Sequence, residues 1–365
     1  MVRCPAAYSV QYFAFAFFIS RPLPAVRTTT STGVAMASAV DFSDLGVRLK
    51  AFSAFQFIRR SCLSLLEAGF RNSLRLAGLL AVALLLPACS TVKLAYNQAP
   101  ELAYWYLDAY ADFTGTQSLQ LKTELTRLHA WHRQTQLPGY VELLQDAQRQ
   151  VRSDISPSQT CVIFFDARRK LLAINERAEA SLALLAASLD ARQLQHMERR
   201  FAKGNAEYRD DFLEARPEAV RTRRLDKAVS RAEMLYGRLD DRQTAMLGRM
   251  IDQSGFDAAR TYAEWLRRQR DALDTFRRLI ASPTAGAIAS PVVDKPAQAV
   301  SGLMERFISS PDAGYRAYAD KLTTDGCKSF AEFHNATSAA QRNHAVAALS
   351  KYEKDLKTLA APGGS

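Results

Sequence analysis

The sequence predicts an all-α protein, a multi-helix bundle of antiparallel helices with no sheet. Apolar residues recur three and four positions apart in five stretches between residues 121 and 359, which is the spacing of one helical face. Helix-start motifs recur along the same part of the chain. Runs of alternating Val, Ile and Thr, which would indicate strands, are absent from residues 89–365.

Each of the five apolar stretches predicts a helix with one buried face. Their apolar positions are Leu121, Leu125, Leu128 and His132; Leu171, Ile174, Ala178, Leu182 and Leu185; Leu194, Met197, Phe201, Tyr208 and Phe212; Tyr262, Leu266, Leu273, Phe276 and Ile280; and Leu349, Tyr352, Leu356 and Leu359.

Four segments have the pattern of a capping box, in which a Ser or Asp precedes a Gln by three residues. They are Ser156–Gln159, Asp190–Gln193, Asp240–Gln243 and Ser338–Gln341. The Ser or Asp oxygen accepts from a first-turn amide, and the Gln side chain reaches back. Two of the boxes share the pattern Leu-Asp-x-Arg-Gln, fifty residues apart. A duplicated helical hairpin is one interpretation; we favour independent convergence on the same cap.

An apolar run, Leu76–Leu86, follows Arg71 and Arg75 and is followed by Pro87-Ala88-Cys89-Ser90. Its eleven residues suit the apolar region of a signal peptide and are too few to span a bilayer as a helix. Residues 71–88 therefore predict a signal peptide. The alternative is a core helix that ends in a buried free cysteine.

The segment Leu86-Pro87-Ala88-Cys89 resembles a bacterial lipobox, although Pro87 departs from the usual residue at its position. The resemblance implies that Cys89 carries diacylglycerol and an N-acyl chain and begins the mature protein. Acyl chains would hold it on a membrane. In lipoproteins that this signal resembles, an Asp after the lipidated Cys favours inner-membrane retention. Position 90 is Ser instead, so we expect a lipid-anchored protein on the periplasmic face of the outer membrane.

The remaining boundaries follow from this signal and from composition. Residues 1–70 have no clear periodicity, and we expect an upstream extension or disordered leader there, with translation beginning near residues 58–70. Residues 89–281 form the expected main helical bundle. Residues 282–297, rich in Pro, Ala, Gly and Ser, predict a linker, and residues 298–360 a C-terminal helical part packed on the bundle.

Charge argues against a nucleic-acid partner. Residues 1–88 hold nine Lys or Arg and three Asp or Glu, which leaves 39 basic and 34 acidic residues in residues 89–365, a net charge of +5. Because the basic residues are interleaved with acids, most of them suit a solvated helix surface. Mild attraction to an anionic cell-wall polymer or lipid surface stays open as an expectation.

Two cysteines, Cys161 and Cys327, remain after the leader and Cys89 are set aside. An even pair in an oxidising compartment predicts a disulfide, with two buried free thiols as the alternative. The bond would close a loop of 166 residues and tie the C-terminal part to the main bundle.

The mature sequence also resembles a known family near both of its ends. The residues that carry the resemblance are Tyr96, Asn97, Pro100, Trp105, Asp108, Tyr110, Asp112 and Gln117, and then Cys327, Phe330, His334–Thr337, Gln341, Arg342, Tyr352 and Asp355. They are similar to a family of proteobacterial outer-membrane lipoproteins whose domain has no assigned function. The resemblance implies an all-helical lipoprotein along essentially the whole mature chain and supplies no catalytic residue.

Catalytic motifs are missing from the sequence. There is no Gly-rich phosphate loop, no Gly-x-Ser-x-Gly and no His-Glu-x-x-His, and we predict no catalytic, metal or cofactor residue. His129 and His132 could share a helix face, but Trp131 beside them suggests packing. The pair His334-Asn335 suits the bracing of a loop.

We therefore expect a binding or structural protein, attached to the membrane through Cys89, whose partner is an envelope protein or an anionic surface. The alternative is a periplasmic hydrolase with a site assembled from scattered Asp, His and Asn, such as Asp108, Asp112 and His334. A deep pocket lined by these residues would favour the enzyme.

Overall fold

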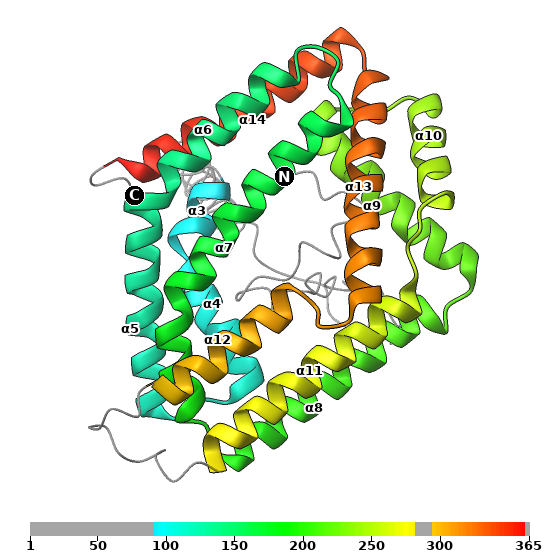
Figure 1. Cartoon of the computed structure of the whole chain (residues 1–365). Coiled ribbons are helices and arrows are strands. Elements are labelled where there is room, and N and C mark those ends of the chain that lie inside the picture. Colours follow the sequence, from blue (N-terminus) through cyan, green and yellow to red (C-terminus); the bar gives the residue numbers. More distant parts are fainter. Residues whose placement is uncertain (1–90, 282–293, 362–365) are drawn as a thin grey trace, which may run out of the picture. The chain divides into compact units, whose positions relative to one another are not determined.

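The computed structural model describes residues 91–281 and 294–361, and this part of the chain is helical with no strand (Figure 1), which confirms the all-α prediction. The helices are α3 (Thr91–Asn97), α4 (Ala99–Ala111), α5 (Gly115–Trp131), η2 (His132–Gln136), α6 (Leu137–Gln150), α7 (Pro157–Ala187), α8 (Ala191–Tyr208), η3 (Arg209–Leu213), α9 (Pro217–Tyr236), α10 (Asp241–Asp252), α11 (Ala258–Ala281), α12 (Asp294–Ile308), α13 (Ala313–Asn335) and α14 (Ala339–Ala360); η2 and η3 are π-helical turns.

Capping boxes open five of the described helices. All four predicted capping boxes form, at the starts of α7, α8, α10 and α14. A fifth box, Thr114 with Gln117, opens α5 and has the same spacing. At the C-terminal end of α9, Gly237 adopts φ 74° and ψ −161°, a conformation that only glycine adopts without strain.

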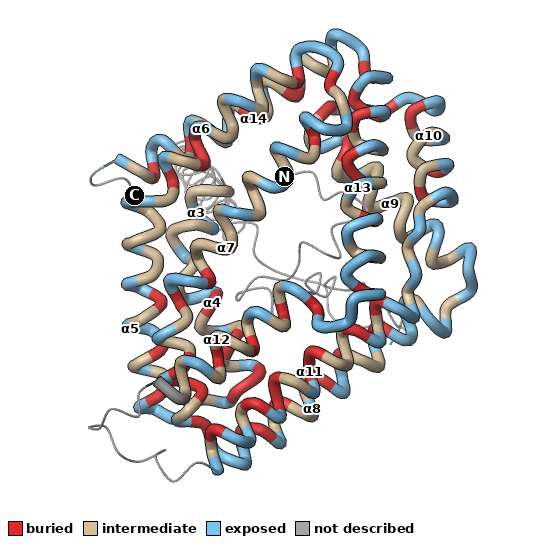
Figure 2. Tube along the Cα trace, in the orientation of Figure 1, coloured by how far each residue is buried: buried red, intermediate tan, exposed pale blue. Residues whose placement is uncertain are grey.

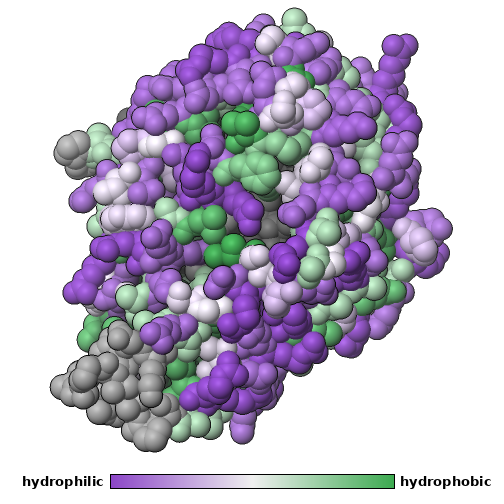
Figure 3. Space-filling model, viewed as in Figure 1, coloured by the Kyte–Doolittle hydropathy of each residue, from purple (hydrophilic) through white to green (hydrophobic). Residues whose placement is uncertain are grey.

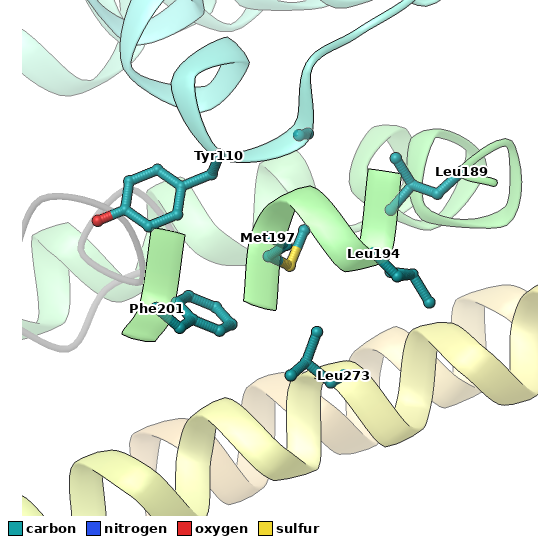
Figure 4. Packing of buried hydrophobic residues seen from close by; sticks show 7 residues of the cluster. Tyr110, Leu189, Leu194, Met197, Phe201 and Leu273 are labelled. Atoms are coloured by element: carbon teal, nitrogen blue, oxygen red, sulfur yellow. The ribbon is translucent and has the colours of Figure 1, made fainter. Parts of the chain in front are cut away.

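One hydrophobic cluster joins α4, α8 and α11. Met197 and Phe201 of α8 lie between Tyr110 at the end of α4 and Leu273 of α11 (Figure 4). Tyr106, Phe276 and Ile280 pack against its edge. A second group, made of Ala103, Leu107, Leu121, Leu125 and Leu185, joins α4, α5 and α7. Together these clusters contain part of each predicted apolar face of α5, α8 and α11.

A separate hydrophobic cluster joins α9, α13 and α14. It is built on Tyr236 and Phe333, with Ala345 of α14 fully buried beside them. Val151 contributes from the end of α6, and Met246 and Met250 from α10 pack against its edge. Along the helices, buried positions alternate with intermediate and exposed ones (Figure 2).

The helices after residue 293 pack on earlier ones. α12 lies against α7 and α11, α13 against α7, and α14 against α6 and α9. Residues 282–293 of the expected linker lie outside the described residues. Its last four residues are not a linker, because α12 begins at Asp294; Pro296 fits there since the first helical turn needs no amide from it.

Ion pairs reinforce the contact between α11 and the end of α12. Arg306 makes a bidentate contact with Asp271, with both N–O distances at 2.9 Å. Arg267 pairs with Glu264 at 2.8 Å and donates to the Arg306 carbonyl at 3.0 Å. Arg268 also pairs with Glu264, at 2.7 Å, and both side chains are at most 5 % exposed. Arg267 and Arg268 of α11 therefore make their ion pairs inside the fold.

Candidate functional site

The first described helix, α3, is held by a cluster of aromatic and basic side chains on α5 and η2. The Tyr96 hydroxyl and His132 Nδ1 are hydrogen-bonded at 2.8 Å. His129 Nε2 donates to the Tyr96 carbonyl at 3.0 Å, and Arg133 donates to Asn97 and lies over the Tyr96 ring. These contacts fix the direction in which the chain enters the bundle.

This cluster has the electrostatics of a packing contact. Burial, followed by the neighbouring His129, lowers the pKa of His132 from 6.5 to about 4. Burial also raises the pKa of Tyr96 to about 12. His132 is therefore neutral near pH 7 and serves as a hydrogen-bond partner. Within the described part of the chain, no group of three or more His, Cys, Asp or Glu side chains could hold a metal ion.

The second region of interest is a polar cavity where the α9–α10 and α13–α14 connections meet. It has a volume of about 430 Å³ and is lined by Arg238, Asp240, Gln243, Asn335, Ala336, Thr337, Ser338 and Gln341. Gln243 and Gln341 come from two capping boxes and donate to each other's Oε1 at 2.8 Å. We call this pair the second clasp, because an equivalent pair, described below, lies earlier in the chain.

Each glutamine of the second clasp also reaches the opposite connection. Gln341 donates to the Arg238 carbonyl at 3.1 Å, and Gln243 to the Ala336 carbonyl at 3.4 Å. Both acceptors lie two residues before the N-cap of the partner box. The sequence predicts the two boxes but not this pairing, because the glutamines are 98 residues apart.

An equivalent pair, which we call the first clasp, joins the α4–α5 and α7–α8 connections. Gln193 donates to the Gln117 Oε1 at 2.8 Å and to the Asp112 carbonyl at 3.1 Å. Gln117 donates to Gln193 at 3.2 Å and to the Ser188 carbonyl at 2.6 Å. These acceptors also lie two residues before the partner's N-cap. The two Leu-Asp-x-Arg-Gln boxes therefore do not pair with each other; each joins a different partner in the same register.

His334, at the end of α13, braces the connection between α6 and α7. Its ring is 0 % exposed. Nε2 donates to the Ser153 carbonyl at 2.9 Å, so Nδ1 of the neutral ring accepts from the Tyr236 hydroxyl at 2.9 Å. Burial lowers the pKa of His334 below its usual 6.5. The imidazole does not line the polar cavity.

Asn335 continues this bracing. Its Oδ1 accepts from the Ile155 amide at 2.9 Å, and its Nδ2 donates to the Ile155 carbonyl at 3.0 Å. Arg342 pairs with Asp154 in the same connection. The loop-bracing interpretation of His334 and Asn335 thus agrees with their contacts.

The two aspartates considered for acid–base chemistry lie at the end of α4. Asp108 Oδ1 accepts from the Phe113 amide at 3.0 Å and so closes the end of the helix. Asp112 pairs with Arg192, whose hydrogen bond is the main reason that the pKa of this carboxyl lies below its usual 3.8. Neither aspartate lines the polar cavity with Asn335.

Cys161 in the second turn of α7 and Cys327 in α13 form a disulfide, with their Cα atoms 5.4 Å apart. The bond closes 166 residues of sequence. It joins two helices that also pack on each other. Reading the cysteines as a matched pair identified the two residues that the structure brings together.

The predicted lipid-attachment residue Cys89 and the sorting residue Ser90 lie outside the described residues, as do the signal peptide and the upstream extension. The described chain begins at Thr91, the second residue after Cys89. Among the described helices, none combines the length and the apolar composition needed to cross a bilayer.

A family model described as a family of unknown function, DUF6279, matches residues 109–281. No curated protein and no solved structure matches the chain. The matched segment runs from the end of α4 to the end of α11, and so includes the first clasp but not Gln341 of the second. It is shorter than the whole mature chain over which we expected a family resemblance. Over this segment the chain is similar to a family of unknown function.

Proposed function

We propose that this protein is a lipid-anchored protein of the bacterial envelope that acts by binding, as an interaction or structural component, on the periplasmic face of the outer membrane. One observation carries the proposal. The apolar run Leu76–Leu86 ends in Pro87-Ala88-Cys89-Ser90, directly before the helical domain that starts at Thr91. A tether at Cys89 would hold the domain close to the membrane.

The contacts of the polar residues support binding over catalysis. A hydrolase would need acid and base groups that converge on a substrate pocket. Asp108 and Asp112 instead complete the end of α4, and His334 braces the α6–α7 connection. The face in Figure 3 is largely hydrophilic, with patches of hydrophobic residues.

Lipidation can be tested on the full-length gene in a Gram-negative host. Mass spectrometry of the mature protein should find an N-terminal peptide that begins at Cys89 and carries acyl chains, and the protein should fractionate with membranes. The Cys89→Ser variant should lose both properties. An N-terminus elsewhere, or an unmodified Cys89, would refute the anchor. Ser90→Asp should move the protein from the outer to the inner membrane.

The binding role needs a second experiment. In-cell crosslinking of the lipidated protein, followed by mass spectrometry, should recover a reproducible envelope protein or cell-wall fragment. The Cys89→Ser variant is the matched control, since it keeps the domain but not its place on the membrane. Recovery of no partner above that control would contradict the interaction role.

A further inference from the structure

We propose that one exposed face of α3 and α4, extended by Leu119 of α5, rests on the phospholipid surface to which the Cys89 lipid attaches. This inference rests on the proposed lipid anchor and names a part of the folded domain that would touch the membrane. We call this face the apolar stripe; it consists of Leu94, Leu102, Trp105 and Leu119.

The residues of the apolar stripe are among the most exposed large hydrophobic side chains in the described chain. Leu94 is 60 % exposed, Leu102 53 %, Trp105 73 % and Leu119 71 %. Water contact on this scale is unfavourable for such side chains. Four of them close together on consecutive helices point to something that covers them.

Helical geometry places three of these residues on one side. α3 and α4 follow each other almost without interruption, since the Gln98 amide donates to the Leu94 carbonyl at 3.1 Å and the Leu102 amide to the Gln98 carbonyl at 3.0 Å (Figure 1). The spacings from Leu94 to Leu102 and to Trp105 are eight and eleven residues. At 3.6 residues per turn these are about 2.2 and 3.1 turns, so the three side chains fall within about 80° of each other around the helix axis.

Leu119 extends this face onto α5. It follows Ser118, which accepts a hydrogen bond from Tyr104 of α4 at 3.1 Å. Tyr104 is the neighbour of Trp105, so this contact brings the two exposed side chains to the same level of the α4–α5 hairpin. Glu101, the neighbour of Leu102, pairs with Lys122 at 3.6 Å.

The stripe is rigidly presented. The opposite side of α4 is fixed in the core through Ala103, Leu107 and Tyr110. α3 is held on α5 and η2 through Tyr96. The stripe therefore cannot turn inward without unpacking the domain.

The place of Cys89 in the chain favours a membrane as the occupant. Two residues span at most about 7 Å, so the start of α3 must lie close to the lipidated cysteine. From Leu94 to Trp105 the helix advances about 16 Å. If the helix lay flat on the membrane, the whole stripe would meet the interface, where Trp is favoured by its amphipathic ring.

A protein partner fits the stripe less well. Stable protein interfaces take about 20 to 30 residues from each side, whereas the stripe has four. A membrane contact can be this small because the lipid tether makes it intramolecular, which raises its effective concentration.

The test uses the purified lipidated protein in vesicles of equal parts phosphatidylethanolamine and phosphatidylglycerol, with and without lipids brominated near the head group. Bromine quenches tryptophan fluorescence at short range. The chain has three tryptophans, so about one third of the emission should be quenched. The Trp105→Phe variant, which keeps Trp131 and Trp265, should show almost no quenching. Equal quenching of wild type and variant would overturn the inference.

A second pair of variants keeps the result independent of Trp105 itself. Leu102→Ser should reduce the quenching of Trp105 by about half, because it removes one apolar anchor. The matched control is Met234→Ser, which changes a residue of similar exposure, 56 %, on α9 and should leave the quenching unchanged. Equal effects of the two changes would overturn the inference.

The outcomes separate this inference from the proposed function. Mass spectrometry of the same sample reports whether Cys89 is acylated, and an unacylated Cys89 refutes the anchor. An acylated protein whose Trp105 is unquenched overturns the stripe alone. A blue shift of Trp105 emission that grows with protein concentration in detergent, without vesicles, would assign the stripe to a second copy and also overturn it.

Discussion

The first and second clasps use the same hydrogen bonds in different surroundings. In the first, Gln193 is 0 % exposed and Gln117 6 %, and the buried residues Ala111, Leu189 and Leu194 of one hydrophobic cluster adjoin it. In the second, Gln243 is 6 % exposed, but Gln341 is only half-buried and faces the polar cavity of about 430 Å³.

This difference shows that the capping box fixes the local backbone geometry, whereas the burial of the surrounding residues determines how much each clasp contributes to the free energy of unfolding. A buried amide that loses its partner leaves other polar groups without hydrogen bonds, which costs more than the same loss beside water. The first clasp should therefore act as a structural joint. The second leaves Gln341 partly accessible to water.

The largest effect should come from the disulfide that ties α7 to α13. Cys161→Ser with Cys327→Ser should lower the free energy of unfolding by about 2–5 kcal/mol, because the bond closes a loop of 166 residues. Chemical denaturation of the lipid-free domain measures the change. Hydrogen exchange should rise more around the second clasp, which α13 leads into, than around the first. Equal protection in both clasps would contradict this difference.

Gln193→Ala should destabilise the protein by about 2–4 kcal/mol, since it removes a cap contact and takes one hydrogen-bond partner from the buried Gln117 side chain. The matched change in the second clasp, Gln341→Ala, should cost only about 1 kcal/mol, because water can replace the lost amide. Urea denaturation of both variants gives the comparison. Equal losses would show that burial does not distinguish the clasps.

Acid should weaken the second clasp before the first, because buried His334 lies beside it. Burial holds its pKa below the usual 6.5, so the unfolded state binds its proton first. Its stabilising contribution is complete above about pH 6.5 and is lost as the pH falls through that value toward the lowered pKa. His129 and His132 also have lowered pKa values, so the His334→Gln variant is needed to isolate this effect.

The measurement is the free energy of unfolding of wild type and His334→Gln from about pH 7.5 to about pH 5. Wild type should lose more stability over this range than the variant, whose Gln does not titrate. Parallel curves would show that His334 does not contribute to the pH dependence.

The smallest effect should come from Gln159, whose capping box opens α7 at an exposed position. In the contacts described for this box, Gln159 bonds to Ser156 of the same box and to no distant segment. Gln159→Ala should cost about 0.5 kcal/mol, the value of a helix cap without a tertiary partner. The cost of this substitution therefore measures what a capping box contributes to stability without the hydrogen bonds of a clasp. A loss as large as that of Gln193→Ala would mean that the clasps add nothing to their caps.

Sequence predicted the local parts of this protein well. Four of the five capping boxes and the apolar faces of the main helices were found from spacing alone. The fifth box, Thr114-Gly115-Thr116-Gln117, has the same pattern after the apolar Phe113 and could have been found in the same way. The start of α12 was placed too late because a proline-rich composition suggested a linker where Pro296 lies in a first helical turn.

The sequence by itself determined the apolar faces and the capped starts of several helices, because caps and faces depend on residues within a few positions of each other. It identified Cys161 and Cys327 as a matched pair through the number of cysteines that follow residue 90. Only the tertiary structure decided which boxes pair, that His334 faces Tyr236 and Ser153, and that the apolar stripe stays exposed. These outcomes depend on side chains from distant segments that meet only when the helices pack. A capping-box Gln can therefore be fully buried, as Gln193 is, or line a polar cavity, as Gln341 does.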